Sequence, residues 1–253
     1  MLNYNELKDI ARLKRLSVIN AEKDYLQELI LFVLYSRISR ELVFKGGTCL
    51  YKVYKLNRFS EDLDFTLTKK MDIEKAMNKL SLDFKLLNVN MKIKEIKDHI
   101  KEKNVRLLFN GPLYHGNKEG QCFIPLNISL REPVILEPNM VKISSLYKEI
   151  TDFNIFVMDK KEILAEKVRA ILTRDKPRDI YDLWFLLKNN TEFDIDLVNK
   201  KLKLYNIEFG YNKFFRSISR KKGLWEIDLK NLILGELPKI ENITREIKKY
   251  LNK

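Results

Sequence analysis

Two aspartates, Asp62 and Asp64, lie two residues apart in the stretch SEDLDFTL, and their type and spacing suit divalent metal binding. On an extended strand, residues at i and i+2 project from one face and are separated by roughly 7 Å. Both carboxylates could therefore contact one cation, or two cations about 4 Å apart. Mg²⁺ needs few protein ligands, because water and substrate phosphates complete its octahedron. The spacing predicts a Mg²⁺ or Mn²⁺ site whose catalytic ligands are Asp62 and Asp64.

A helix N-cap at Ser60 followed by solvated acids would be the structural alternative for the same residues. Leu63 and the Phe65–Leu67 run favour a strand over a helix start, because alternating apolar, aromatic and β-branched residues suit a half-buried sheet. The metal-binding interpretation is the better supported of the two.

A second pattern, Gly46-Gly47-Thr48, precedes the aspartates by about a dozen residues. A glycine pair lets backbone N–H groups approach phosphate oxygens with no Cβ in the way. A helix that starts at these glycines would also direct its free N–H groups at an anion. We expect Gly46, Gly47 and Thr48 to hold the phosphates of a nucleotide.

Three neighbours of this turn could add to nucleotide binding. Ser60 offers a hydroxyl donor, and Lys45 and Arg58 could neutralise departing phosphates. Lys45 and Arg58 could equally be surface charges, and the sequence leaves both interpretations open.

A third group of charged residues lies in the second half of the chain. Lys167 falls in the middle of one expected helix, and Arg178, Asp179 and Asp182 fall in the first turns of the next. The two aspartates are three residues apart and share a helix face. Such a cluster often forms a structural ion-pair network between packed helices. Taken alone, the residues favour that structural role over a functional one.

Three blocks of sequence, in this order, resemble the nucleotidyltransferase toxin family that includes AbiEii, AbiGii and the mycobacterial MenT proteins. They are residues 45–50, residues 58–65 and the block EILAEKVRAILTRDKPRDIYDLWFLL. The family is a branch of the DNA polymerase β-like nucleotidyltransferases. The resemblance implies an α+β, bilobed fold, in which a mixed sheet with flanking helices is followed by an α-helical domain. It also implies an enzyme that transfers NMP from an NTP to RNA, with tRNA 3′ ends as acceptor, restrained by a cognate antitoxin.

The resemblance also assigns roles to the charged residues of the helical half. The matching lysine, Lys167, would bind triphosphate together with Arg178, while Asp182 and Asp179 would close the cleft from the helical side. One position departs from the superfamily pattern. Where a later strand usually supplies a third carboxylate, this chain has Asn127, which can ligate Mg²⁺ through its amide oxygen but cannot accept a proton as a carboxylate does.

Composition agrees with a globular nucleotide enzyme without identifying one. The chain has 253 residues, 45% hydrophobic and 33% charged, and a net charge of +13. The excess of positive charge favours anionic partners such as RNA, although a basic proteome produces the same balance. Cys49 and Cys122 form neither a metal motif nor a disulfide framework. No signal peptide is visible, and the run from Leu29 is too short to span a bilayer, so we expect a cytoplasmic protein without membrane contact.

These side chains must be positioned by an alternation of helices and strands in the first part of the chain. Apolar residues at helical spacing predict a core helix over residues 20–40, and further helices are expected over 48–55 and 72–80. Strands are expected over 42–44, 61–67, 88–96, 105–109 and 121–130, with a turn-rich connection from Gly111. The nucleotidyltransferase domain should cover residues 1–157.

Residues 158–253 should form the helical domain. Asp159 is a good N-cap with Glu162 placed to complete a capping box, and Pro177 can open the next helix. Asp194 or Asp196 should start another helix. The end of the chain, residues 241–253, is expected to be a solvated basic helix or a frayed tail. Aromatic residues between 205 and 215, interleaved with basic ones up to Lys222, are either a helical core edge or an RNA surface.

Two classes of function stay open on these grounds. The leading hypothesis is the toxin-type nucleotidyltransferase acting on RNA. The alternative is a nucleotide- or RNA-binding relative without turnover, for which Asn127 is the sequence support, and a third possibility is transfer to a protein or small molecule. The residues do not distinguish the acceptors.

Overall fold

The computed structural model describes residues 1–251 and divides them into two compact units. The first unit comprises residues 1–53, 59–134 and 138–157, and the second comprises 54–58, 135–137 and residues from 158 onward. The last segment of the first unit thus ends at Val157. Two short segments from earlier in the chain belong with the helices of the second unit.

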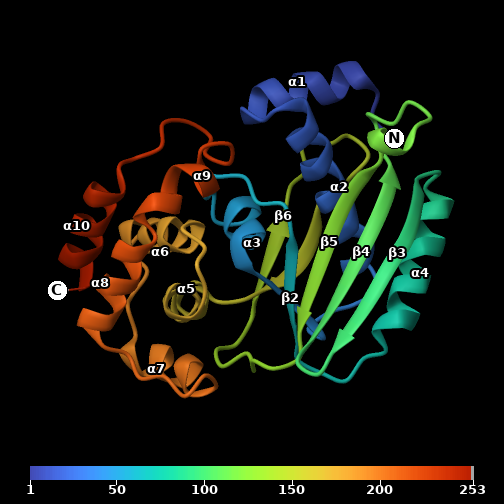
Figure 1. The fold of residues 1–253 in the computed structure, drawn as a ribbon. Coiled ribbons are helices and arrows are strands. Elements are labelled where there is room, and N and C mark those ends of the chain that lie inside the picture. The colour runs from blue at the N-terminus through green and yellow to red at the C-terminus, as the bar shows by residue number, and fades with distance from the viewer. Residues whose placement is uncertain (252–253) are drawn as a thin grey trace. The chain divides into compact units, whose positions relative to one another are not determined.

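The first unit is built on a mixed sheet of seven strands in the order β3-β4-β5-β2-β1-β7-β6 (Figure 1). Neighbours β1/β7 and β2/β5 are parallel, and the other neighbouring pairs are antiparallel. This sheet with its helices confirms the expected α+β class. The strands are β1 (Leu42–Lys45), β2 (Leu63–Leu67), β3 (Asn90–His99), β4 (Glu102–Asn110), β5 (Cys122–Ser129), β6 (Asn139–Ile143) and β7 (Phe153–Val157).

Four α-helices accompany the sheet among the described residues. They are α1 (Tyr4–Lys14), α2 (Val18–Tyr35), α3 (Gly46–Lys52) and α4 (Ile73–Leu86), and a short 3₁₀ turn, η1, covers Lys118–Gly120. α2 packs on β5 and β7, and α4 packs along β3. On β4, Val105, Leu107 and Phe109 are fully buried, so the alternation predicted for this strand does face the core.

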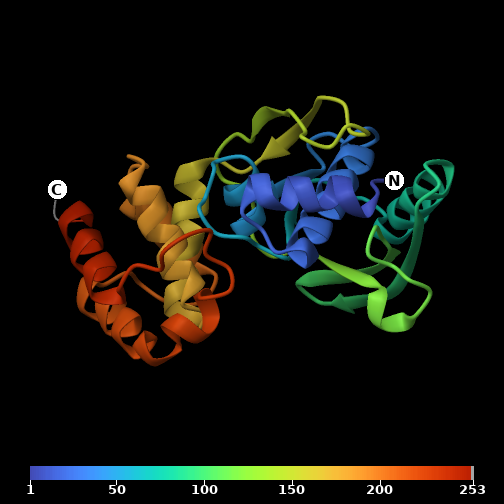
Figure 2. The ribbon, with the colours of Figure 1, turned by 90° about the horizontal axis from the view of Figure 1, so that it is seen from above.

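The second unit is helical, as the resemblance implied (Figure 2). α5 packs against α6, α7 and α8, and α10 packs against α6. The helices are α5 (Lys160–Thr173), α6 (Arg178–Lys188), α7 (Ile195–Lys203), α8 (Tyr211–Arg220), α9 (Trp225–Leu229) and α10 (Ile240–Leu251), with a 3₁₀ turn, η2, over Lys222–Leu224.

The end of the chain is a helix, as one of the two predicted alternatives had it, but the prediction that this helix is solvated is wrong for one of its faces. α10 buries Ile240, Ile243, Ile247 and Leu251, which recur at intervals of three and four and form one apolar face. The basic residues occupy the other face and gave the stretch its polar appearance. Residues 252 and 253 of that prediction lie outside the described part of the chain.

Helix termini differ from the predicted ones by a few residues for local reasons. α2 ends at Tyr35, five residues early, and α4 runs on to Leu86. Asp159 does cap α5, through a hydrogen bond from the N–H of Lys161. The carboxylate of Glu162, which the capping-box pattern pairs with the N-cap, accepts hydrogen bonds from the N–H groups of Ile135 and Leu136. In residues 1–251, no helix combines the length and the apolar character that crossing a bilayer requires.

Candidate functional site

Asp64 occupies β2, the middle strand of the seven, and its neighbours on both sides are residues that the sequence singled out. It pairs in register with Lys45 on β1 and with Asn127 on β5. The amide Nδ2 of Asn127 donates a hydrogen bond of 2.9 Å to Asp64 Oδ1. The strand expected to supply a third acid therefore does lie beside this aspartate, and at that position it offers an amide that orients the Asp64 carboxylate.

Gly46 lies against the other oxygen of the same carboxylate. A Cβ atom at Gly46 would come within 2.3 Å of Asp64 Oδ2, and the residue adopts a positive φ of 75°. Both observations require glycine here, because an L side chain would clash with the carboxylate and would be strained in this conformation. α3 begins at this residue, so the helix predicted to start at the glycines does so. Gly46 thus allows the start of α3 to approach Asp64 closely.

Asp62 lies just before β2, on the same face as Asp64. Asp62 and Asp64 are half-buried while Leu63 and Phe65 are fully buried, and this alternation indicates that both carboxylates leave the chain on one side. The hydroxyl of Thr48 donates a hydrogen bond to the backbone carbonyl of Asp62. Thr48 is fully buried and so connects α3 directly to the acidic segment.

The oxygen donors at this place fit a hard divalent cation. Two half-buried carboxylates and one amide oxygen are the kinds of ligand that Mg²⁺ and Mn²⁺ prefer. Within residues 1–251, no group of three or more His, Cys, Asp or Glu side chains is arranged to hold a metal ion. A cation at Asp62 and Asp64 would therefore share its coordination with Asn127, water or substrate phosphate.

Lys45 and Arg58 are not surface charges, and that alternative is wrong. Lys45 is 7% exposed, and its Nζ lies 3.8 Å from Glu132 Oε2. Arg58 is 1% exposed and belongs to the helical unit. Ser60, the third predicted neighbour of the turn, is also buried, at 8% exposure.

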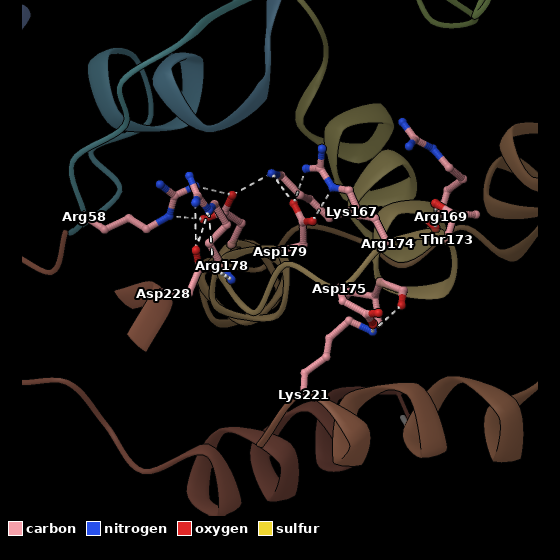
Figure 3. Close-up of polar contacts among 12 residues, drawn as sticks. Arg58, Lys167, Arg169, Thr173, Arg174, Asp175, Arg178, Asp179, Lys221 and Asp228 are labelled. Atoms are coloured by element: carbon pink, nitrogen blue, oxygen red, sulfur yellow. Dashed lines mark hydrogen bonds and ion pairs between the residues drawn. The ribbon is translucent and has the colours of Figure 1, made fainter. Parts of the chain in front are cut away.

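In the helical unit, the predicted residues form an extended ion-pair cluster (Figure 3). Arg58 binds Asp182 through two parallel hydrogen bonds of 2.7 Å, from Nε and Nη2. The ammonium of Lys167 lies 2.6 Å from Asp182 Oδ2 and 2.9 Å from Asp179 Oδ1. Arg174 lies at the end of this row of ion pairs and donates two hydrogen bonds to Asp179, of 2.8 and 2.9 Å. Three cations thus alternate with two carboxylates.

The ionised state of this cluster is favoured despite its burial. Burial alone would raise the pKa of Asp179, but Lys167 and Arg174 outweigh it and bring the pKa below the ordinary value. The pKa of Asp182 is lowered in the same way, because Arg58 and Lys167 outweigh the effect of burial. Burial would lower the pKa of Lys167, yet the two aspartates raise it. All the charges of the cluster therefore persist at neutral pH.

Arg178 pairs with Asp228 of α9. Its backbone N–H donates to Asp228 Oδ2 at 2.9 Å, and its Nη2 donates to Asp228 Oδ1 at 2.7 Å. The arginine therefore holds α9 to the start of α6.

The structure groups the predicted site residues into two sets, each within its own unit. The sheet unit holds Lys45, Gly46, Gly47, Thr48, Ser60, Asp62, Asp64 and Asn127, whereas the helical unit holds Arg58, Lys167, Arg178, Asp179 and Asp182. Arg58, which the sequence associates with Ser60, belongs to the second set.

The sequence analysis missed a group of buried polar residues on α2. Glu22, Asp24, Gln27 and Glu28 are all at most 5% exposed in a helix that was predicted only as apolar core. Lys52 of α3 contacts Asp24 Oδ1 at 2.7 Å, so the pair fastens α3 to α2. Polar residues recurring on the inward side of an otherwise apolar helix were the available signal, because such residues are buried only with partners.

A mixed sheet that carries paired aspartates on its middle strand, beside a glycine turn that opens a helix, has the features of a nucleotidyltransferase. The family model described as nucleotidyl transferase AbiEii toxin, type IV toxin–antitoxin system, matches residues 30–250. The chain belongs to this family and is a nucleotidyltransferase toxin of a type IV toxin–antitoxin system. Membership implies an NTP as nucleotidyl donor and a cognate antitoxin.

Two solved structures illustrate the similarity of fold. JHP933 from Helicobacter pylori is 25% identical, with a TM-score of 0.61, and the match covers 92% of this chain and 90% of that one. MenT4, a nucleotidyltransferase toxin from Mycobacterium tuberculosis H37Rv, is 18% identical with a TM-score of 0.67, and the match covers 96% of this chain and 87% of the other. No curated protein is similar enough in sequence to match the chain.

Proposed function

We propose that this protein transfers a nucleoside monophosphate from an NTP to an RNA acceptor, the 3′ end of a tRNA, with the help of Mg²⁺ or Mn²⁺. The observation that carries the proposal is the environment of Asp64, whose carboxylate lies between Gly46 and Asn127 with Asp62 on the same face. The net charge of +13 supports a polyanionic acceptor.

Each of these residues of the sheet unit has a role in the proposed reaction. A divalent cation, when bound, lowers the charge cost on the attacking and leaving oxygens of the α-phosphate. Asp62 and Asp64 would hold it, with the Asn127 amide oriented toward the same place. Gly46, Gly47 and Thr48 would receive the phosphates of the NTP, with Ser60 as a further donor. Lys45, buried in the register position opposite Asp64, would offset negative charge there.

Roles for the helical cluster are also part of the proposal. Lys167 and Arg178 would contact phosphate, and Asp179 and Asp182 would hold Lys167 in place. The ion pairs support the second statement, because the ammonium of Lys167 lies between the two carboxylates. Arg58 would act through Asp182, to which its Nε and Nη2 donate two parallel hydrogen bonds.

Labelling of RNA tests the function. Purified protein is incubated with total RNA, Mg²⁺ and each α-³²P-labelled NTP in turn, alongside the Asp62→Ala, Asp64→Ala double variant. We expect label on a tRNA-sized band with the wild type only. Growth arrest on expression should likewise disappear in the double variant, and persistent toxicity would refute the role of the two acids.

Two other outcomes would redirect the proposal. Label on protein or on a small molecule would keep the chemistry and change the acceptor. Saturable NTP binding without pyrophosphate release would favour a binding relative without turnover, for which the amide at Asn127 is the supporting observation, since it cannot take up a proton as a carboxylate does.

A further inference from the structure

Three successive carbonyl groups before β2 are held by side chains. The side-chain amide of Gln27 donates to the carbonyl of Ser60 at 2.9 Å and to that of Glu61 at 2.8 Å. The hydroxyl of Thr48 donates to the next carbonyl, that of Asp62. Register pairing of β2 begins only afterwards, at Leu63 with β5 and at Asp64 with β1. The backbone that carries Asp62 is therefore fixed by α2 and α3.

The Gln27 side chain is itself held in place, so it can fix the backbone at residues 60 and 61. It lies in the middle of α2 and is fully buried, so its side chain has little freedom. Both of its N–H groups are used on the segment, while its Oε1 has no hydrogen-bond partner among the described residues. An amide that satisfies two carbonyls of the acidic segment and leaves its own oxygen unpaired is oriented by that segment alone.

A second residue of α2 reaches the same segment. Lys23, one helical turn before Gln27, forms an ion pair with the side chain of Glu61. The same face of the helix thus contacts both the backbone and a side chain of the residue that precedes Asp62.

We infer that Gln27 is a positioning residue of the metal site, which, together with Thr48, fixes the main chain at residues 60–62 so that the Asp62 carboxylate is aligned with that of Asp64. This inference rests on the proposed role of Asp62 and Asp64 as metal ligands. Partners that orient metal ligands commonly contribute about 10- to 100-fold in metal affinity. The Thr48 hydroxyl therefore positions the main chain at Asp62 even when no nucleotide is bound.

Mn²⁺ binding to the full-length protein without nucleotide tests the inference. Free Mn²⁺ is measured by electron paramagnetic resonance for the wild type, Gln27→Met and the Asp62→Ala, Asp64→Ala double variant. Gln27→Met keeps the length of the side chain and removes both donors. We expect it to bind Mn²⁺ about 10- to 100-fold more weakly than the wild type.

Tyr35→Phe provides the matched control. The Tyr35 hydroxyl lies on the same helix and also contacts two backbone carbonyls, those of Leu42 and Phe156, at 2.8 and 3.1 Å. Its removal should leave Mn²⁺ affinity unchanged while urea unfolding reports the loss of comparable contacts. Equal affinities in Gln27→Met and Tyr35→Phe would overturn the inference and leave the proposed function intact.

Thr48→Val and Thr48→Ser keep the test decisive if Gln27→Met fails to fold. Valine removes the hydroxyl and serine retains it, so we expect weakened Mn²⁺ binding with valine and recovery with serine. Wild-type affinity in a folded Thr48→Val variant would contradict the inference. Mn²⁺ binding that is the same in the wild type and in the double aspartate variant would refute the proposed metal ligands, and the inference with them.

Discussion

The Asp64 carboxylate is enclosed on two sides, by the Asn127 amide at Oδ1 and by Gly46 at Oδ2. Its spacing from Asp62 and its neighbour in a later strand were predicted, and the structure does place Asn127 beside it. The close approach of Gly46 was not predicted, because the glycines were expected to serve phosphate and not to make room for a carboxylate. Period-two patterns show which side chains share a face, but they do not show which backbone lies against that face.

Replacing Asn127 with aspartate should strengthen metal binding. The Asn127→Asp carboxylate would lie in register with Asp64 and add a charged oxygen ligand. We expect the half-saturating Mn²⁺ concentration to fall by about tenfold, in line with a favourable charge interaction of about 1.4 kcal/mol. Without metal, two adjacent carboxylates should lower the unfolding midpoint. Unchanged Mn²⁺ affinity in a folded variant would show that this position faces away from the ion.

Gly46→Ala should destabilise the sheet unit and abolish activity. The added methyl group would lie against the Asp64 carboxylate in a backbone conformation that alanine rarely adopts. Strain and overpacking together should cost about 2–4 kcal/mol, measured by urea unfolding. Gly223→Ala is the control, since no atom lies within 4 Å of its added Cβ. Equal stability of the two variants would contradict the need for glycine at position 46.

At the scale of elements, the apolar periodicity of α2 predicted the helix but not its buried charges. Asp24 is fully buried, and its carboxylate contacts Lys14, Lys52 and the Tyr147 hydroxyl. Burial would raise the pKa of Asp24, but Lys52 and Lys14 outweigh it and lower the pKa to about 2. The polar residues of α2 were visible in the sequence, but their partners come from other elements and could be identified only once the fold was known.

The depressed pKa of Asp24 makes a definite prediction for acid stability. A group with a lowered native pKa contributes stability above its unfolded value, near 3.9, and loses it as the pH falls toward 2. The contribution of Asp24 to the free energy of unfolding at neutral pH is about 2–3 kcal/mol. Asp24→Asn should therefore lower stability at pH 7 and flatten its dependence between pH 4 and 2. Urea unfolding at several pH values measures the free energy of unfolding, and the exposed residue Asp9, as Asp9→Asn, provides the control. If the pH dependence of that free energy is the same in Asp24→Asn as in the wild type, Asp24 is not its source.

At the scale of the molecule, the order of most helices and strands was predictable, whereas α1, β6, β7 and the membership of the two units were not. The alternation of the first part and the helices after residue 157 follow from periodicity and caps. Segments 54–58 and 135–137 were expected in the sheet unit and lie in the helical one. Both are short and irregular, and what assigns them is a distant contact, such as Arg58 with Asp182 or Ile135 with Glu162.

Arg58→Met should destabilise the helical unit strongly. It would remove two hydrogen bonds from Asp182, which is fully buried, and leave that carboxylate with Lys167. Breaking a buried pair in this way costs about 3–5 kcal/mol, whereas replacing both partners by apolar residues is often tolerated. Urea unfolding of Arg58→Met and of Arg58→Met, Asp182→Leu compares the two cases. A loss below about 1 kcal/mol in the single variant would show that the pair is dispensable.

The pairing of Arg58 with Asp182 also bears on how the toxin is made. The two residues are 124 positions apart, so during translation Arg58 leaves the ribosome long before its partner is synthesised. The strand β7, which pairs with β1, is likewise among the late parts of its unit. The sheet unit ends at Val157 and can be complete earlier, but the helical unit cannot reach its final contacts in a nascent chain that stops short of α6. A truncated product that ends before α6 should therefore lack the Arg58–Asp182 pair and have an unstable helical unit.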